Sequence, residues 1–259
     1  MTKGTFLITG ASDGIGAVYA DRLARRGHDL ILVARRADKL EALAATITAE
    51  TGVRVETLGA DLARADDLAR VEQRLREDAA ITGLVNNAGI AGETTFAGAD
   101  PAYLTGMIDL NVLAVTRLAA AIAPRLAEIG GGTIINMTSV TALMPDGFTA
   151  VYPATKAYVL AFTEALETEL GAKGVRVQAV LPGITRTPIW TEAQLANFPA
   201  EMVMDVDDMV DAALKGLDLG ETITIPALPD NADLDAYLNA RRALRPNLSR
   251  NRPAERYGR

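Results

Sequence analysis

Short apolar runs alternate with longer amphipathic stretches along the whole chain. Seven runs rich in apolar and β-branched residues are predicted to be strands, at residues 5–9, 30–34, 54–58, 83–86, 132–137, 176–181 and 221–225. They are apolar almost throughout, which is typical of parallel strands that are buried on both faces. Helical patterns lie between them, at residues 15–26, 37–50, 64–79, 101–128, 154–172 and 207–218.

The stretch at residues 37–50 shows why these segments should be helices. Leu40, Leu43, Ala44 and Ile47 recur at spacings of three and four residues and form one apolar stripe, and Gly52 follows as a stop signal. A strand–helix alternation repeated six times predicts an α/β fold with a doubly wound sheet of seven parallel strands and helices on both faces.

Two segments depart from this alternation within what we expect to be a single domain, residues 1–259. Residues 184–206 contain Trp190 and Phe198 between a strand and a helix, and we expect a mobile flap. Residues 227–259 form a C-terminal extension, whose last part, 241–259, has seven arginines and one acidic residue. We interpret this basic tail as solvated or as a contact between subunits.

Composition excludes several classes of protein. The chain of 259 residues has 26 Lys and Arg against 33 Asp and Glu, for a formal charge of −7, and it has no cysteine. An acidic pI near 4.9 argues against a nucleic-acid partner. The absence of cysteine and the single histidine, His28, exclude thiolate nucleophiles and the usual metal centres, so we expect no metal.

The expected location is the cytoplasm. The sequence starts directly with a strand pattern and shows no signal-peptide anatomy. No uncharged apolar run approaches the roughly 18–20 residues that a membrane span needs, so no membrane partner is expected.

A glycine-rich turn joins the first predicted strand to the first predicted helix. Glycines let the backbone turn tightly and approach a pyrophosphate, and the start of the helix offers free N–H groups to the anion. This position predicts a dinucleotide site, although the spacing G-x-x-x-G-x-G differs from the more familiar G-x-G-x-x-G. The expected cofactor-binding residues of the turn are Gly10, Ser12, Asp13, Gly14, Ile15 and Gly16.

The end of the second strand indicates which dinucleotide binds. An acidic residue there would bind the ribose diol of NADH, whereas Ala34 is followed by Arg35 and Arg36, whose guanidinium groups suit the 2′-phosphate of NADPH. NADP(H) is therefore the expected cofactor. An ordinary exposed arginine pair is the alternative. Asp13 is acidic and cannot help to clamp a phosphate, so the preference rests on the two arginines.

Tyr152 and Lys156 lie four residues apart, on one face of a predicted helix. A free phenol has a pKa of about 10 and is a poor proton shuttle at neutral pH. An ammonium at roughly 5 Å would favour the phenolate by about 3 kcal/mol, or two pKa units, although burial opposes this. Ser139 follows the strand at 132–137 and could hydrogen-bond a substrate carbonyl; alternatively, it is a loop serine.

Together these motifs resemble those of the short-chain dehydrogenase/reductase family, over nearly the whole chain to about residue 226. The order and spacing of the motifs agree with the family pattern throughout. The matching motifs are residues 9–16, Asp61-Leu62, residues 86–89, Asn111, Ser139, Tyr152-x-x-x-Lys156 and Pro182-Gly183 with Thr185 and Thr187. The resemblance implies a Rossmann fold. Two departures are Pro153, which is tolerable only where a helix begins, and the tail beyond residue 226, which matches no family motif.

The resemblance also implies roles for individual residues. Tyr152 would be the general acid, Lys156 would lower its pKa and hold the nicotinamide ribose, Ser139 would orient the carbonyl, and Asn111 would hold a relay water. The remaining cofactor contacts would be Asp61 and Leu62 at the adenine, Asn86, Asn87, Ala88 and Gly89 at the ribose, and Pro182, Gly183, Ile184, Thr185 and Thr187 at the carboxamide.

The expected function is reduction of a ketone or aldehyde by NADPH, or oxidation of a secondary alcohol. A 3-oxoacyl-carrier-protein reductase and a silent NADP(H)-binding regulatory protein are the alternatives. The resemblance implies a homotetramer or homodimer that assembles through the helices at 101–128 and 154–172. The expected substrate-pocket residues are Met144, Phe148, Ile184, Trp190 and Phe198, with Glu93 and Thr94.

Overall fold

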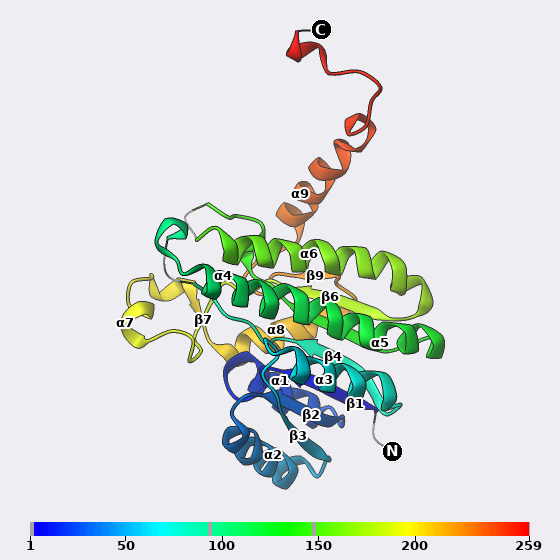
Figure 1. Cartoon of the computed structure of the whole chain (residues 1–259), viewed down its shortest axis with the longest axis vertical. Helices are drawn as coiled ribbons and strands as arrows, with labels where there is room; N and C mark the ends of the chain where they lie inside the picture. The colour runs from blue at the N-terminus through cyan, green and yellow to red at the C-terminus, as the bar shows by residue number, and fades with distance from the viewer. Residues whose placement is uncertain (1–2, 93–94, 147–148, 259) are drawn as a thin grey trace. The chain divides into compact units, whose positions relative to one another are not determined.

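One sheet of seven parallel strands forms the centre of the first 226 residues, in the order β3-β2-β1-β4-β5-β6-β9 (Figure 1). The computed structural model describes residues 3–92, 95–146 and 149–258. All seven predicted strands are present: β1 (Thr5–Thr9), β2 (Asp29–Ala34), β3 (Val55–Gly59), β4 (Ile81–Asn86), β5 (Thr133–Met137), β6 (Arg176–Val180) and β9 (Ile223–Thr224). The order reverses between β1 and β4, which confirms the predicted doubly wound Rossmann fold.

Helices cover both faces of this sheet. The principal helices are α1 (Gly14–Arg25), α2 (Ala37–Thr51), α3 (Ala65–Glu77), α4 (Pro101–Ile108), α5 (Val115–Ile129), α6 (Val151–Leu170) and α8 (Val206–Leu219). Successive strand residues point to opposite faces, so Phe6 and Ile8 pack with α1, α2 and α8, whereas Leu7 packs with α3, α5 and α6. The continuous apolar strands reflect this burial on both sides.

The helix predicted at 101–128 has a wider turn in its middle. A π-helical segment, Asp109–Ala114, separates α4 from α5. The whole stretch Pro101–Ile129 is long and apolar enough to cross a membrane by length and composition. Half of its most apolar window is buried inside the protein, and core helices of soluble proteins meet the same criterion, so it is weak evidence for a membrane span.

Helix α6 begins at Val151, so the tyrosine of the Tyr-x-x-x-Lys motif lies in its first turn. Pro153 is tolerated in the same turn because the first N–H groups of a helix have no partner within it. This removes the doubt that the sequence raised about a proline directly after the tyrosine.

The segment 184–206 contains regular structure that the sequence pattern did not predict. Two short strands, β7 (Ile184–Thr185) and β8 (Val203–Met204), pair in parallel and bring the ends of the segment together. Between them lies the one-turn helix α7 (Glu192–Leu195), which starts with a capping box of Thr191 and Gln194. We call residues 184–206 the flap.

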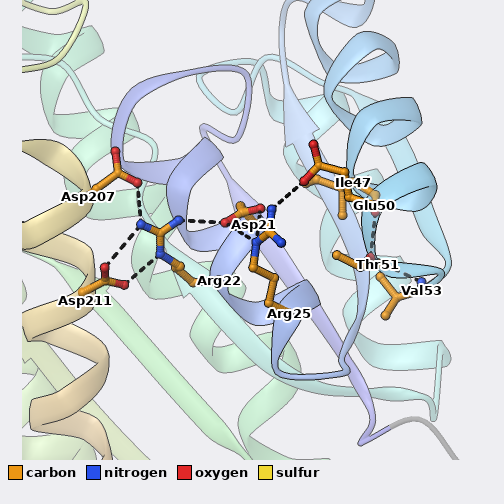
Figure 2. A network of polar contacts seen from close by, with 9 residues as sticks. All are labelled: Asp21, Arg22, Arg25, Ile47, Glu50, Thr51, Val53, Asp207 and Asp211. Carbon is orange, nitrogen blue, oxygen red and sulfur yellow. Dashed lines mark hydrogen bonds and ion pairs between the residues drawn. The ribbon is translucent and has the colours of Figure 1, made fainter.

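An ion network joins α1 to α8, the helix that follows the flap (Figure 2). Arg22 on α1 donates to Asp211 at 2.8 Å and to Asp207 at 2.5 Å, and both acids lie on α8. Arg22 also bonds Asp21, and Arg25 links Asp21 to Glu50 on α2. The helix that starts at the glycine turn is thereby tied to the carboxyl end of the flap.

Residues Ala227–Arg259 cluster as a second, smaller unit. Its one α-helix is α9 (Ala232–Ala243), followed by the short 3₁₀ turns Arg245–Asn247 and Glu255–Tyr257. All described side chains from Arg241 onward are exposed. The sequence pattern did not predict α9, because it lacks an extended apolar stripe.

Candidate active site

A cavity of about 900 Å³ lies at the carboxyl ends of the strands, where the strand order reverses. Its lining comes from the loops after β1, β2, β3, β4, β5 and β6. All the predicted catalytic and cofactor-binding residues line it except Gly16, Asn86 and Asn111. The lining also includes residues that sequence reasoning missed, among them Ile90, Ala91, Val140, Thr141 and Thr149.

The glycine turn, residues 10–16, is packed too closely for side chains. Gly10 and Gly14 have φ values of +65° and +54°, in the left-handed region that favours glycine. A Cβ atom on Gly16 would lie 2.4 Å from the carbonyl oxygen of Gly10 and 2.7 Å from the Asn87 amide nitrogen. Gly16 therefore supports the turn from behind and does not line the cavity.

Asn87 and Thr9 hold the glycine turn against the end of β4. The Asn87 amide donates to the carbonyls of Thr9 at 3.0 Å and Gly10 at 3.2 Å. The Thr9 hydroxyl accepts from the backbone N–H groups of Asn87 and Ala88, both at 3.0 Å. Thr9 had no predicted role, although a threonine at the last position of a buried strand was a usable signal.

Asn86 points elsewhere. It is buried and its amide donates to Asn136 on β5 at 2.9 Å, and Asn136 donates in turn to Thr163 on α6. Its expected place beside the ribose is therefore wrong: successive residues of a strand face opposite sides, and this one faces α6. The pair Asn86 and Asn136 instead ties β4, β5 and α6 together.

Arg35 and Arg36, at the end of β2, lie in different environments. Both arginines line the cavity. Arg36 donates to the Asp13 carboxylate at 2.6 Å and to the Ser12 hydroxyl at 2.7 Å. In the described part of the chain Arg35 forms no ion pair. Arg36 is thus already bound by Asp13 in this structure, and the contact of the two arginines with a 2′-phosphate stays a prediction.

Asp61 and Leu62 line the cavity at the end of β3. One Asp61 carboxylate oxygen accepts from the N–H of Ala63 at 3.1 Å and closes a local turn. The backbone N–H of Asp61 donates to Asp67 at 2.8 Å. These bonds fix the loop that Leu62 shares, and the proposed contact with adenine stays a prediction.

Ser139, Tyr152 and Lys156 meet in the cavity. Ser139 follows β5, and the two other residues lie on one face of α6. The Lys156 ammonium lies 5.7 Å from the centre of the Tyr152 ring. The hydroxyl of Thr138 donates to the backbone carbonyl of Lys156 at 2.7 Å, which anchors α6 on the end of β5.

Burial dominates the electrostatics of this group. It raises the pKa of Tyr152, and a hydrogen bond from the Ser139 hydroxyl opposes the rise. Burial also lowers the pKa of Lys156 to about 8. The sequence predicted a lowered pKa for Tyr152. In the chain alone the net shift is upward, because desolvation of the phenolate outweighs its stabilisation.

Lys156 is a buried cation with few protein partners. Its ammonium donates to the backbone carbonyl of Met137 at 3.0 Å, and this is the only hydrogen bond of the ammonium to the described residues. An ammonium has three donors, and a buried charge is costly unless it is hydrogen-bonded. The site therefore suits a ligand that brings further acceptors to Lys156.

Asn111 lies in the π-helical segment and is buried. Its amide nitrogen donates to the Ile90 carbonyl at 2.9 Å and to the Thr155 hydroxyl at 3.2 Å, and its oxygen accepts from the Ile90 N–H. Both of its N–H donors are thus used within the protein, and the side chain holds the loop after β4 against α6. The relay water predicted for Asn111 stays a prediction.

The flap forms the remaining wall. Pro182, Gly183, Ile184, Thr185 and Thr187 line the cavity as expected, and the Thr187 side chain packs against Gly14. Farther along the flap, Trp190 and Phe198 also line the cavity and contact each other edge to face, with ring centres 5.9 Å apart. Met144 is exposed and does not belong to the lining. Phe148, Glu93 and Thr94 lie outside the described residues.

Comparisons with known proteins agree with this site. Residues 4–197 match the family model of the short chain dehydrogenases. A short-chain dehydrogenase from Sphingobium yanoikuyae in complex with NADPH is 50% identical, with a TM-score of 0.94 over 98% of this chain and 100% of that one. A bulky-bulky ketone specific alcohol dehydrogenase from Comamonas testosteroni is 44% identical, with a TM-score of 0.92 over 100% of both chains.

Curated relatives are more distant. Very-long-chain 3-oxoacyl-CoA reductase-B of Danio rerio is 31% identical over 188 residues, which are 71% of this chain and 60% of that protein. The match thus spans about 60% of the relative's length. Because the family model covers most of the chain and the structural neighbours cover nearly all of it, the chain belongs to the short-chain dehydrogenase family of oxidoreductases.

Proposed function

We propose that this protein is an NADPH-dependent carbonyl reductase that also works in reverse as a secondary alcohol dehydrogenase. The observation that carries the proposal is the buried Lys156 ammonium, with one acceptor among the described residues, beside Tyr152 and Ser139 in a cavity of about 900 Å³. The NADPH complex of the S. yanoikuyae protein supports the choice of cofactor.

The residues present fit a dinucleotide. The glycine turn offers close backbone approach at the start of α1, which suits a pyrophosphate. Arg35 lines the cavity at the end of β2 and would bind the 2′-phosphate. Lys156 and Tyr152 would hold the nicotinamide ribose, and the backbone from Pro182 onward would hold the carboxamide.

NADPH, when bound, supplies a hydride to the carbonyl carbon of the substrate. The chain orients the substrate and provides the proton. Ser139 donates to the carbonyl oxygen, and Tyr152 transfers its phenolic proton to that oxygen as the alcohol forms. A raised pKa keeps Tyr152 protonated before the reaction, and the adjacent Lys156 charge stabilises the phenolate that remains. Asn111 is a positioning residue.

An apolar, bulky ketone suits the substrate side of the cavity. Ile184, Trp190 and Phe198 supply an apolar wall on the flap, and Val140 lines the cavity beside Ser139. The name of the C. testosteroni neighbour, a bulky-bulky ketone specific enzyme, supports the same class. The names of the curated relatives favour one second candidate, a 3-oxoacyl thioester.

A substrate panel distinguishes these candidates. We would follow NADPH absorbance with a ketone that carries two bulky groups, a small dialkyl ketone and a 3-oxoacyl-CoA. We expect the highest kcat/KM for the bulky ketone. Replacing Trp190 with Ala should lower that value about tenfold while changing it little for the small ketone. NADPH binding without turnover of any substrate would indicate a silent nucleotide-binding protein.

We also propose that the protein is a homodimer or homotetramer of the cytoplasm. Exposed apolar side chains on α4, the π-helical segment and α6 support assembly through these helices: Tyr103, Ile108, Leu113 and Tyr158. Light scattering on the purified chain tests this. We expect at least a dimer, and a mass of one chain at micromolar concentration would contradict the proposal.

A further inference from the structure

The side chain of Asp13 has turned away from the helix that it begins. Asp13 occupies the N-cap position of α1, where a carboxylate usually accepts from the first N–H groups, but it makes no such capping bond. Its carboxylate instead accepts from Arg36 at 2.6 Å, and the Lys39 nitrogen lies 3.5 Å from the same oxygen. Two cations from the start of α2 thus converge on one acid of the glycine turn.

These groups lie where the proposed function places the 2′-phosphate of NADPH. Asp13, Arg35 and Arg36 all line the cavity. The Arg36 nitrogen that contacts Asp13 also donates to the Ser12 hydroxyl, so a phosphate would have to share that nitrogen or displace its present partners. Arg35 forms no ion pair among the residues that the structure describes.

We propose that Asp13 is a cofactor-selectivity residue that competes with the 2′-phosphate for Arg36 and Lys39. This proposal rests on the proposed function. The carboxylate repels a phosphate dianion and already occupies one of its cations, so it weakens NADPH binding. The 2′-hydroxyl of NADH carries no charge and can donate to the same carboxylate. Asp13 therefore makes the preference for NADPH smaller than the cations alone would produce.

The expected size of the effect follows from exposure. The side chains of Arg36 and Asp13 are 48% and 30% exposed, so solvent and salt screen their interaction. Removing the carboxylate should tighten binding of a 2′-phosphate about fivefold at low ionic strength. The gain should shrink at high salt, because screening reduces the repulsion that Asp13 exerts.

Asp13→Asn tests the proposal by calorimetry with two nucleotide fragments. Adenosine 2′,5′-bisphosphate carries the 2′-phosphate and 5′-AMP does not. Asparagine is also a good N-cap, so the variant keeps the start of α1. We expect about fivefold tighter binding of the bisphosphate with no gain for 5′-AMP, and the same pattern for NADPH against NADH. Equal changes for both fragments would overturn the proposal.

Asp38→Asn is the matched control. Asp38 lies exposed in the first turn of α2, close in sequence to the same cations, but it forms no ion pair among the described residues. Replacing Asp38 removes the same charge. It should raise the affinity for the bisphosphate by less than half of the gain expected for Asp13→Asn. An equal gain would mean that net charge, and not the contact with Arg36, sets the effect, and would overturn the proposal.

The arginine itself provides the second check. In an Arg36→Gln background, Asp13→Asn should lose part of its effect, because the competition for Arg36 is gone while the repulsion and the contact with Lys39 remain. An undiminished effect would overturn the proposal. If the unaltered protein binds neither NADPH nor the bisphosphate, the proposed function fails; unchanged selectivity in a protein that binds both contradicts only the role of Asp13.

Discussion

The ammonium of Lys156 lies 5.7 Å from the centre of the Tyr152 ring, yet its hydrogen bond goes to the backbone carbonyl of Met137. The lysine is thus held beside the phenol by the end of β5 and not by the phenol itself. In this arrangement burial favours the neutral form of each side chain. A ligand that supplies acceptors would stabilise the charged form of Lys156.

Binding of NADPH should therefore be accompanied by proton uptake above pH 8. Burial lowers the pKa of Lys156 to about 8, and ribose hydroxyl acceptors would raise it again, so the lysine gains a proton on binding. Calorimetry at pH 9 in two buffers of different ionisation enthalpy measures this uptake. Lys156→Met should abolish it, and an uptake that survives in that variant would contradict the assignment.

The same shift affects stability. Between about pH 8 and the ordinary lysine pKa of 10.5, the unfolded chain binds more protons at Lys156 than the folded chain does. The contribution of Lys156 to the free energy of unfolding therefore rises with pH across this window in the absence of NADPH. Urea denaturation at several pH values, compared with Lys156→Met, isolates it. The free energy of unfolding of the unaltered protein minus that of Lys156→Met should rise with pH. A value that falls with pH would contradict the burial of the ammonium.

Gly16→Ala should damage both the fold and cofactor binding. The new methyl group would lie 2.4 Å from the Gly10 carbonyl oxygen, so the glycine turn must shift. We expect a loss of about 1–3 kcal/mol in the free energy of unfolding and at least a tenfold weaker affinity for NADPH. Gly106→Ala on α4 is the control, because outside the helix's own backbone no described residue lies within 4 Å of its added methyl group. Similar losses in both variants would refute the packing argument.

Arg22→Met should loosen the tie between α1 and α8. Arg22 is partly buried and bonds Asp207 and Asp211, so we expect a loss of about 1 kcal/mol in the free energy of unfolding. A double-mutant cycle with Asp211→Asn should show coupling that falls at high salt. Arg70→Met, which removes an exposed pair within α3, should cost less than half as much. No coupling in the cycle would contradict a specific link between the helices.

The runs of apolar residues predicted the strands of the sheet well because these strands are buried on both faces. The apolar side chains from Leu30 to Val33 can all be buried only if helices cover both faces of the sheet. This argument does not depend on which strands are their neighbours. Tyr152 and Lys156 were equally accessible to sequence reasoning, since a spacing of four residues on one helix determines that they share a face.

Features that depend on distant segments were not predictable in this way. The bond between Arg36 and Asp13 joins residues that are 23 positions apart and exists because β2 lies next to β1. The strands of the flap are two residues long and carry no periodicity. The pKa of Tyr152 is raised because several segments of the chain bury this side chain. The sequence argument considered only the distance to one cation, Lys156, and that distance does not show the burial.

The most direct test of the account is single-turnover reduction of a bulky ketone by Tyr152→Phe loaded with NADPH. Loss of the proton donor should slow NADPH oxidation by a factor of about 10²–10⁴ while the affinity for NADPH changes less than about threefold. Tyr158→Phe, on the same helix but outside the cavity, should react like the unaltered protein. Undiminished turnover by Tyr152→Phe would contradict the account.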